Sequence, residues 1–336
     1  MRADSSHFLT RWVWWGVATI TVVLPVFNRA QVLPRAIESV LAQTFPDFEL
    51  IVVDDGSRDG THELLARQSD RRVRVITVGR NRGACAARNR GIEEARGELL
   101  CFLDSDDIYL PDKLEVVSTL FGGRPDLDVL VDSFVCHKGV GPKRRAKRKL
   151  NPPGLGGSAF RSALFERRIA KATSALSVRR RALVEVGSFD ERLRRRQDLD
   201  LVLRLSRRHV CSTTDRVLWE KHESLDAISR DHGLFLQASI DICDRHPEYL
   251  SEYSASLYRD LRSHFSWLVR QRHWRDLFAD VRRYSGYAPF EHSLVRLMLD
   301  GRISGRAQAD STQRTRRDSG RPPSSAETIC VPASVE

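Results

Sequence analysis

Residues 99–107 read Leu-Leu-Cys-Phe-Leu-Asp-Ser-Asp-Asp, a short apolar run that ends abruptly in carboxylates. Three other apolar runs come before it, at residues 19–26, 48–53 and 73–78, and each also leads into polar residues. Amphipathic stretches with helical spacing separate the runs. Near-continuous apolar strands indicate a sheet buried on both faces, and their alternation with helices is typical of a parallel sheet. The sequence therefore predicts an α/β fold over residues 18–136.

The helices of this region are predicted from their start signals. Asn28 is expected to cap the first helix, a second helix follows Asp59, a third covers residues 83–96, and a fourth begins at Pro111, which suits a first helical turn. Later segments are predicted from composition and periodicity: a surface loop at 137–157, a strand at 173–178, helices at 179–186, 197–207 and 233–299, and a disordered tail at 302–336.

The charge of the chain is concentrated in one segment. The 336 residues include 55 Lys+Arg and 44 Asp+Glu, a formal net charge of +11, and residues 137–208 alone hold 21 basic and 6 acidic side chains. The hydrophobic fraction of 41% and the charged fraction of 29% are those of an ordinary globular protein, which argues against a disordered, fibrous or multispanning membrane chain. The local excess of charge suggests contact with something anionic, although an Arg-rich solvated surface is the simpler interpretation.

The cysteines and the N-terminus bear on the compartment. The six cysteines show no CxxC or Cys/His ligand spacing, so neither a cysteine zinc site nor a disulfide framework is expected, and a reducing cytoplasmic compartment is favoured. The uncharged run from Trp12 to Phe27 is shorter than the ~20 residues that span a bilayer. Trp12, Trp14 and Trp15 are expected to pack on the domain or to anchor it at a membrane interface.

Polar side chains follow each predicted strand. They are Asn28, then Asp54 and Asp55, then Asn81 and Arg82, then Asp104 and Asp106. Since ligands of open α/β sheets bind at the carboxyl ends of strands, these residues point to one crevice. Asp104 and Asp106 would suit Mn²⁺ or Mg²⁺ or form a solvated turn, Asp55 would accept a uracil imide or complete a turn, and Arg88 would meet phosphates or lie on the surface.

In combination these motifs resemble the family 2 glycosyltransferases, which have the Rossmann-like GT-A fold. The resemblance is dense over residues 19–115, and its order and spacing agree with the family. It is carried by Val22-Val23-Leu24-Pro25-Val26-Phe27-Asn28-Arg29, Ser39 to Phe45, Val52 to Ser57 with Asp59-Gly60-Thr61, Asn81-Arg82-Gly83 with Ala87-Arg88-Asn89, Ala95 to Glu98, and Phe102 to Asp107 with Pro111. A weaker block contains Ser174 to Arg180, Val186 to Glu191 and Gln197 to Leu205.

The resemblance implies an inverting transfer of a sugar from a nucleoside diphosphate, most simply UDP, to an acceptor hydroxyl in cell-surface polysaccharide or glycolipid synthesis. By the same resemblance, the donor-binding residues are Pro25, Phe27, Asn28, Asp55, Asn81, Arg82, Arg88 and Asp104. Asp104 and Asp106 would hold the Mn²⁺ or Mg²⁺, and His222 would complete the metal or phosphate site. Asp198 would be the general base, with Gln197 in place of the usual Glu.

These assignments divide the chain by function into an extension (1–17), a donor half (18–136), an acceptor half (137–230), a helical region (231–300) and a tail (301–336). The expected acceptor is anionic or lipid-linked, and the expected location is the cytoplasm or the inner face of a membrane, with the basic run Lys143 to Lys149 as a contact. A nucleotidyltransferase has no place for Gln197-Asp198. A nucleic-acid-binding protein would need aromatic residues within the basic run, and a P-loop kinase would need GxxxxGK[ST].

Overall fold

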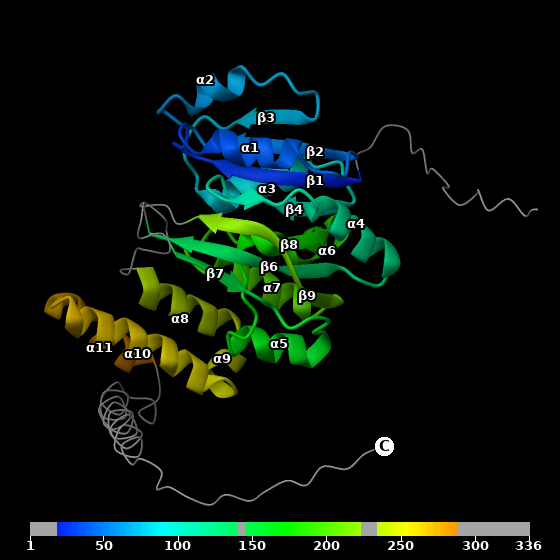
Figure 1. Ribbon diagram of the computed structural model, residues 1–336. Coiled ribbons are helices and arrows are strands. Elements are labelled where there is room, and N and C mark those ends of the chain that lie inside the picture. Colours follow the sequence, from blue (N-terminus) through cyan, green and yellow to red (C-terminus); the bar gives the residue numbers. More distant parts are fainter. Residues whose placement is uncertain (1–18, 140–144, 223–233, 288–336) are drawn as a thin grey trace, which may run out of the picture. The chain divides into compact units, whose positions relative to one another are not determined.

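The computed structural model describes residues 19–139, 145–222 and 234–287. Contacts divide the chain into two units, residues 1–257 and 258–336. The first unit contains one mixed sheet with the described strand order β3-β2-β1-β4-β8-β6-β9-β5, and β7 pairs with β6 (Figure 1). The second unit contains most of α10 (Ser254–Arg270) and all of α11 (Trp274–Tyr287), which are joined by a His264–Asp280 contact of 2.8 Å.

The predicted parallel strands are confirmed. They are β1 (Ile20–Val26), β2 (Phe48–Asp54), β3 (Val73–Thr77) and β4 (Leu99–Phe102), and each pairs in parallel with its neighbour. All residues of β1, β2 and β4 are buried, as their apolar composition requires, whereas β3 lies at the edge and is half exposed. The order 3-2-1-4 places a switch point between β1 and β4.

The helices that join these strands are α1 (Leu33–Leu41), α2 (Thr61–Ala66), α3 (Ala84–Glu94) and α4 (Lys113–Gly123). α3 packs on β1 and β2 at close range, because a Cβ added at Gly91 would lie 2.5 Å from Val23 Cγ1. Asn28 does not cap α1, since Val32 holds that position and Asn28 adopts a left-handed φ of 53° in a turn before the helix. α4 likewise begins two residues after Pro111, with Asp112 as its N-cap.

The rest of the sheet in residues 1–257 comes from later segments. Its strands are β5 (Ile108–Tyr109), β6 (Val129–Lys138), β7 (Arg145–Lys149), β8 (Leu176–Arg179) and β9 (Cys211–His222). β8 pairs antiparallel with both β4 and β6, β6 pairs in parallel with β9, and β5 pairs antiparallel with β9. The strand expected at residues 173–178 is thus shorter, because a 3₁₀ turn, Thr173–Ala175, precedes it.

The prediction of a loop over the basic run was wrong for its described part. Arg145–Lys149 forms β7, which pairs antiparallel with β6 from Phe134 to Lys138. Backbone pairing to an edge strand requires no apolar side chains, so a run of charged residues can form a strand whose side chains stay in water. Residues 145–148 are indeed exposed. Residues 140–144 lie outside the described residues.

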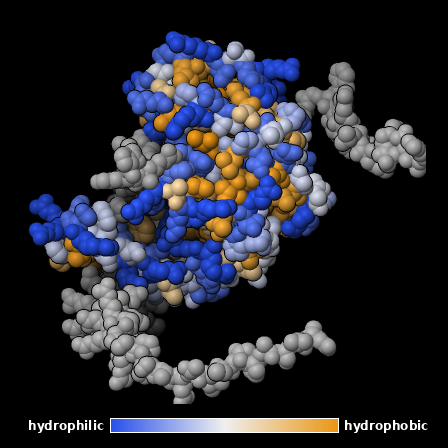
Figure 2. All heavy atoms as spheres, in the orientation of Figure 1, coloured by the Kyte–Doolittle hydropathy of each residue, from blue (hydrophilic) through white to orange (hydrophobic). Residues whose placement is uncertain are grey.

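Helix α7 (Gln197–Ser206) packs on α5 (Gly157–Phe165) and on α6 (Arg180–Val186), and α5 also contacts β9 while α6 contacts β8. α8 (Phe235–Arg245) and α9 (Glu248–Ser251) follow β9. Figure 2 shows that hydrophilic side chains cover most of the visible surface, while apolar side chains reach it over the sheet. None of the described helices is long and apolar enough to cross a membrane. The predicted N-terminal lead-in, residues 288–299 of the predicted helical region, and the predicted tail lie outside the described residues.

Candidate active site

The loops that follow β1 and β2 are tied together at the switch point. The Asn28 N–H donates to Ser57 Oγ at 2.9 Å, and Asn28 Oδ1 accepts from the Arg58 N–H at 2.8 Å. The Ser57 N–H in turn donates to Asp54 Oδ1 at 2.9 Å. Asn28 and Asp54 thereby join the two loops at the carboxyl ends of β1 and β2. Pro25 is buried within β1, whereas Phe27, the next residue but one, is 38% exposed and offers a ring face.

Asp55 holds the loop between β3 and α3. Its carboxylate is 2% exposed and accepts the Arg82 N–H at 3.0 Å and the Gly83 N–H at 2.7 Å. Gly56 allows this loop to approach closely: its φ is +82°, and an added Cβ would lie 3.1 Å from the backbone of Arg80. Asp55 therefore has a clear structural task, and its contact with a uracil stays a prediction.

Of the remaining predicted residues of this loop, Asn81 has a partner within the loop and Arg82 has one outside it. Asn81 Oδ1 accepts the Gly83 N–H at 3.0 Å. The Arg82 guanidinium is 55% exposed and pairs with Glu191 Oε2 at 3.1 Å. The Arg82 side chain is thus turned toward Glu191.

Arg88 and Asp104 form the central ion pair. Arg88, which is 5% exposed, donates from Nη2 to Asp104 Oδ1 at 2.6 Å, and its guanidinium lies 5.3 Å from the centre of the Phe189 ring. Arg88 Nε and Nη1 are buried and have no hydrogen-bond partner among the described residues. Burial favours the neutral form of Asp104, but Arg88 and Lys221 outweigh it and hold the pKa of Asp104 below its ordinary value.

A serine fixes the turn that contains the carboxylates. The buried Ser174 hydroxyl accepts the Asp104 N–H at 3.0 Å and donates to Asp107 Oδ2 at 2.7 Å. The other oxygen of Asp107 accepts the His222 N–H at 3.1 Å. Burial raises the pKa of Asp107 to about 8, with Asp104 and Asp106 adding to the effect and Lys221 opposing it.

The residues present fit a divalent ion. Asp106 is half-buried, and no hydrogen bond or ion pair is formed by its carboxylate within the described part of the chain. Asp104 is paired only through one oxygen, to Arg88. Two oxygen donors spaced by one residue at a strand end are the kind of ligands that Mg²⁺ and Mn²⁺ take, usually completed by water or phosphate oxygens.

Lys221 is a site residue that the sequence analysis missed. Burial lowers the pKa of this ammonium group, but Asp107, Asp104, Asp106 and Asp198 together raise it above its ordinary value. One cation thus interacts with four carboxylates from two distant parts of the chain. Since the motif that contains His222 was identified, the alternation of side chains along a strand could have pointed to its neighbour.

Asp198 lies in the first turn of α7, as predicted. Its Oδ2 is 3.3 Å from Lys171 Nζ, and its side chain is 20% exposed. Gln197, which replaces the glutamate expected from the resemblance, donates from Nε2 to the Leu193 carbonyl at 3.0 Å. The amide therefore supports the turn before α7, a task that a carboxylate could not perform as a donor.

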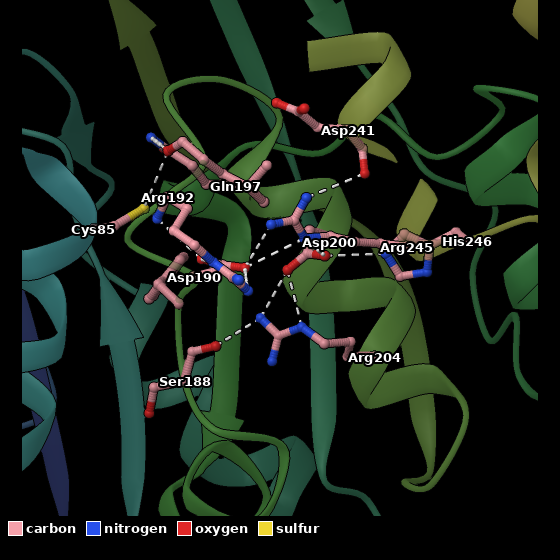
Figure 3. Close-up of polar contacts among 12 residues, drawn as sticks. Cys85, Ser188, Asp190, Arg192, Gln197, Asp200, Arg204, Asp241, Arg245 and His246 are labelled. Carbon is pink, nitrogen blue, oxygen red and sulfur yellow. Dashed lines mark hydrogen bonds and ion pairs between the residues drawn. The ribbon is translucent and has the colours of Figure 1, made fainter. Parts of the chain in front are cut away.

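A buried ionic network anchors α7 two residues beyond Asp198 (Figure 3). Asp200, 2% exposed at its side chain, meets Arg204 at 2.8 Å and His246 Nε2 at 3.1 Å. Arg204 also donates to the Val186 and Ser188 carbonyls, each at 2.6 Å. In the same network Arg245 pairs with Asp190 at 2.8 Å. The helix that bears Asp198 is thus fixed to α6 and α8.

His222 contacts the acidic turn through its backbone. Its imidazole stacks on His137, with ring centres 4.8 Å apart, and its Nε2 lies 3.3 Å from Glu220 Oε2. The ring is thus placed with groups that the sequence analysis did not consider. Its service as a ligand beside Asp106 stays a prediction.

Taken together, the switch point, the Arg88–Asp104 pair, the acidic turn after β4 and Asp198 at the start of α7 define an α/β protein with charged and polar residues at its strand ends. The chain belongs to Glycosyl transferase family 2, whose model matches residues 21–198. Residues 1–257 contain the whole of this match.

The relatives match only part of this chain and part of their own length. The chain is 49% identical over 98 residues to the succinoglycan biosynthesis protein ExoO of Rhizobium meliloti, a match that takes in 29% of this chain and 28% of that protein. It is 31% identical over 140 residues to the UDP-Glc:alpha-D-GlcNAc-diphosphoundecaprenol beta-1,3-glucosyltransferase WfgD of Escherichia coli, 39% of this chain and 54% of that protein. Both matches span less than two thirds of the relative.

Among solved structures, TarS 1-349 of S. aureus, in complex with UDP-GlcNAc, matches with a TM-score of 0.61 and 18% identity, covering 82% of each chain. The same fragment with UDP matches with a TM-score of 0.55. These likenesses establish the fold, a mostly parallel sheet flanked by helices of the GT-A kind.

Proposed function

We propose that the protein is an inverting glycosyltransferase that moves a sugar from a UDP-sugar to an acceptor hydroxyl. The observation that carries the proposal is the Arg88–Asp104 ion pair at the end of β4, beside Asp106 and Asp107, together with Asp198, whose charge and theirs all raise the pKa of Lys221. Asp104, Asp106 and Asp107 follow β4, and Asp198 begins α7, so the fold brings together an acidic strand end and a separate carboxylate. A one-step displacement needs both, one group for the departing diphosphate and one for the acceptor proton.

The donor nucleotide would bind along the ends of β1 and β2. Phe27 offers an exposed ring face, while the Asn28 turn and Asp55 define the depth of the pocket. The Asp55 carboxylate already accepts the backbone N–H groups of Arg82 and Gly83. In this proposal it accepts the uracil imide N–H through a remaining lone pair. Pro25 supports the wall from within β1, and Asn81 lies beside it on the loop before α3.

Asp104 and Asp106 would hold Mn²⁺ or Mg²⁺, which when bound supplies Lewis-acid stabilisation of the diphosphate charge. The chain adds its own cations. The same carboxylates raise the pKa of Lys221. The Nε and Nη1 atoms of Arg88 are buried hydrogen-bond donors that have no partner among the described residues. We propose that Arg88, Arg82 and Lys221 bind the phosphate oxygens as negative charge builds on the leaving group.

Asp198 would accept the proton of the acceptor hydroxyl. Lys171 holds its Oδ2 at 3.3 Å, and Oδ1 has no partner among the described residues. The free oxygen is the atom to which the proton moves while the acceptor oxygen attacks the sugar. The helix that carries Asp198 is anchored two residues on, where Asp200 meets Arg204 and His246.

The acceptor is proposed to be anionic or lipid-linked, in cell-surface polysaccharide or glycolipid synthesis at the cytoplasmic face of a membrane. Two observations support this. The printed name of WfgD describes a diphosphoundecaprenol-linked acceptor for that enzyme. In this chain β7 exposes Arg145, Lys147 and Arg148 on an edge strand, and each basic residue near an anionic surface contributes about 1 kcal/mol.

The experiment that tests the proposal is a screen of UDP-sugars and other sugar nucleotides for release of the nucleoside diphosphate by the purified protein. We expect release from a UDP-sugar in Mn²⁺ or Mg²⁺ and its loss in excess chelator. Full turnover in chelator would remove the proposed ion. Release of pyrophosphate from a nucleoside triphosphate and a sugar phosphate would instead support the nucleotidyltransferase alternative.

The membrane contact is tested separately, with Arg145, Lys147 and Arg148 all replaced by Gln. We expect this variant to bind anionic vesicles less than the wild type does, while its release of UDP in solution stays the same. A matched control replaces the exposed Arg90 and Arg124 with Gln. Equal vesicle binding by the wild type and the β7 variant would make β7 an ordinary solvated edge.

A further inference from the structure

A fully buried lysine and aspartate lie close to the acidic turn that follows β4. Lys113, the first residue of α4, donates from Nζ to Oδ2 of Asp132 in β6 at 2.6 Å, and both side chains are 0% exposed. Burial raises the pKa of Asp132 to about 6, and Lys113 opposes this effect. The pair is therefore charged at neutral pH, although no ligand can contact it directly. A buried ion pair of this kind often adds no stability over apolar side chains of similar volume.

The Lys113 ammonium group has further partners besides Asp132. It donates to the Ser174 carbonyl at 2.9 Å, and it lies 4.6 Å from the centre of the Tyr109 ring. The Tyr109 hydroxyl in turn donates to the carbonyl of Phe102, the last residue of β4, at 2.6 Å. Lys113 thus contacts both the serine that binds the acidic turn and the tyrosine that joins the two ends of that turn.

Ser174 connects Lys113 to the carboxylates. Its carbonyl accepts from Lys113, while its hydroxyl accepts the Asp104 N–H at 3.0 Å and donates to Asp107 Oδ2 at 2.7 Å. Ser174 is 0% exposed and belongs to the short 3₁₀ turn before β8. One hydroxyl can accept from the first group and donate to the second only from a narrow range of positions. The residue that fixes Ser174 therefore also fixes the backbone at Asp104.

We propose that Lys113 is a positioning residue for the divalent ion assigned to Asp104 and Asp106. It orders the acidic turn through Ser174 before the donor arrives, and Asp132 keeps the ammonium group in place. The inference rests on the proposed function for the ion itself, whereas the order of the turn is a property of the chain alone. Loss of a group that holds a metal ligand commonly weakens metal affinity about 10- to 100-fold, which sets the size of the expected effect.

The test replaces the whole pair in the full chain, as Lys113→Met with Asp132→Leu. Because apolar side chains in place of a buried ion pair often preserve stability, this double variant should keep a urea midpoint close to that of the wild type. It lacks the bond to the Ser174 carbonyl, so we expect the Asp104 amide to exchange with solvent at least about 10-fold faster in the metal-free protein. The Mn²⁺ concentration for half-maximal UDP release should rise about 10-fold, with a smaller change in turnover at saturating Mn²⁺.

A second neutral pair, Lys113→Met with Asp132→Asn, keeps the shape of the aspartate and should behave in the same way. Ser174→Ala keeps the buried ion pair and removes only the hydroxyl, so it should reproduce both the faster exchange and the higher Mn²⁺ requirement.

The control is Asp128→Asn, which removes a 7% exposed carboxylate that pairs with Arg181 at 3.0 Å, directly before β6. This variant should match the wild type in Asp104 exchange and in Mn²⁺ requirement. Wild-type values of both in a folded Lys113 variant would make the pair purely structural and overturn the proposal. Absence of Mn²⁺-dependent UDP release by the wild type would instead overturn the proposed function, while the exchange rates would still test the link from Lys113 to the turn.

Discussion

Two groups of carboxylates in residues 1–257 have the same chemistry and opposite degrees of pairing. Asp190 is held by Arg192 and Arg245, and Asp200 by Arg204, Arg245 and the His246 ring, in the network that anchors α7. At the end of β4, Asp106 forms no hydrogen bond or ion pair within the described residues, and Asp104 meets Arg88 through one oxygen, although both carboxylates raise the pKa of Lys221. In the network, the carboxylate oxygens are bonded to other groups of the protein. At the end of β4, carboxylate oxygens are left that a ligand could bind.

The difference separates stability from function. A carboxylate whose partners are all internal contributes to folding, and its removal leaves buried cations uncompensated. A carboxylate held among like charges without partners costs folding free energy and is useful only when a ligand arrives. Substitutions in the two groups should therefore change different measurements.

The largest expected effect is on turnover, from Asp106→Asn. We expect release of UDP from the donor to fall by about 10²- to 10³-fold, since one group that stabilises transition-state charge is lost. The free energy of unfolding should change by less than about 0.5 kcal/mol, because the relief of repulsion within the acidic turn is offset by the lost attraction to Lys221. Kinetics and urea unfolding of the same sample measure both. Asp126→Asn, at an exposed carboxylate, is the control, and equal turnover in both variants would contradict the comparison.

Asp200→Asn should affect stability first. The substitution removes a 2% exposed charge from Arg204 and His246, and breaking such a buried pair costs about 3–5 kcal/mol. Urea unfolding should show the loss, while donor affinity measured well below the unfolding midpoint should stay within about twofold. A stable Asp200→Asn protein with weakened donor binding would mean that the network belongs to the site.

The smallest effect is the pH dependence of stability. Burial favours the neutral form of Asp200, but His246 and Arg204 outweigh it and lower its pKa; Arg192 and Arg245 lower the pKa of Asp190. A lowered folded-state pKa adds stability that is present above the ordinary value of about 3.9 and is lost as the pH falls below it. Unfolding between pH 5 and pH 3 should therefore be less pH-dependent in Asp200→Asn than in the wild type. Parallel curves would contradict this.

The sequence predicted the elements whose signals are local. The strands from Ile20 to Phe102 are continuous apolar runs between helices, and their polar ends mark the crevice, so Asp104, Asp106 and Arg88 could be placed near one another. The strands β6 and β9 were missed, since they combine buried apolar residues with polar ones, and their pairing depends on segments about 80 residues apart.

Two further features depended on tertiary structure. β7 is a strand because its backbone pairs with β6. The residues Arg145–Lys149 alone give no sign of that pairing. Lys221 belongs to the site because the charges of the acidic turn raise its pKa, whereas the adjacent His222 contacts that turn through its backbone. Motif reasoning identified the segment but could not say which face each side chain occupies.

The measurement that tests the central claim most directly is donor turnover by Asp198→Asn. With a UDP-sugar, Mn²⁺ and either the acceptor or water, we expect this variant to bind UDP with wild-type affinity and to lose about 10²- to 10⁴-fold in turnover, the range for a general base. Glu115→Gln, another first-turn helix carboxylate, should behave as the wild type does. Wild-type turnover by Asp198→Asn would contradict the claim that the crevice joins an acidic strand end to a catalytic base.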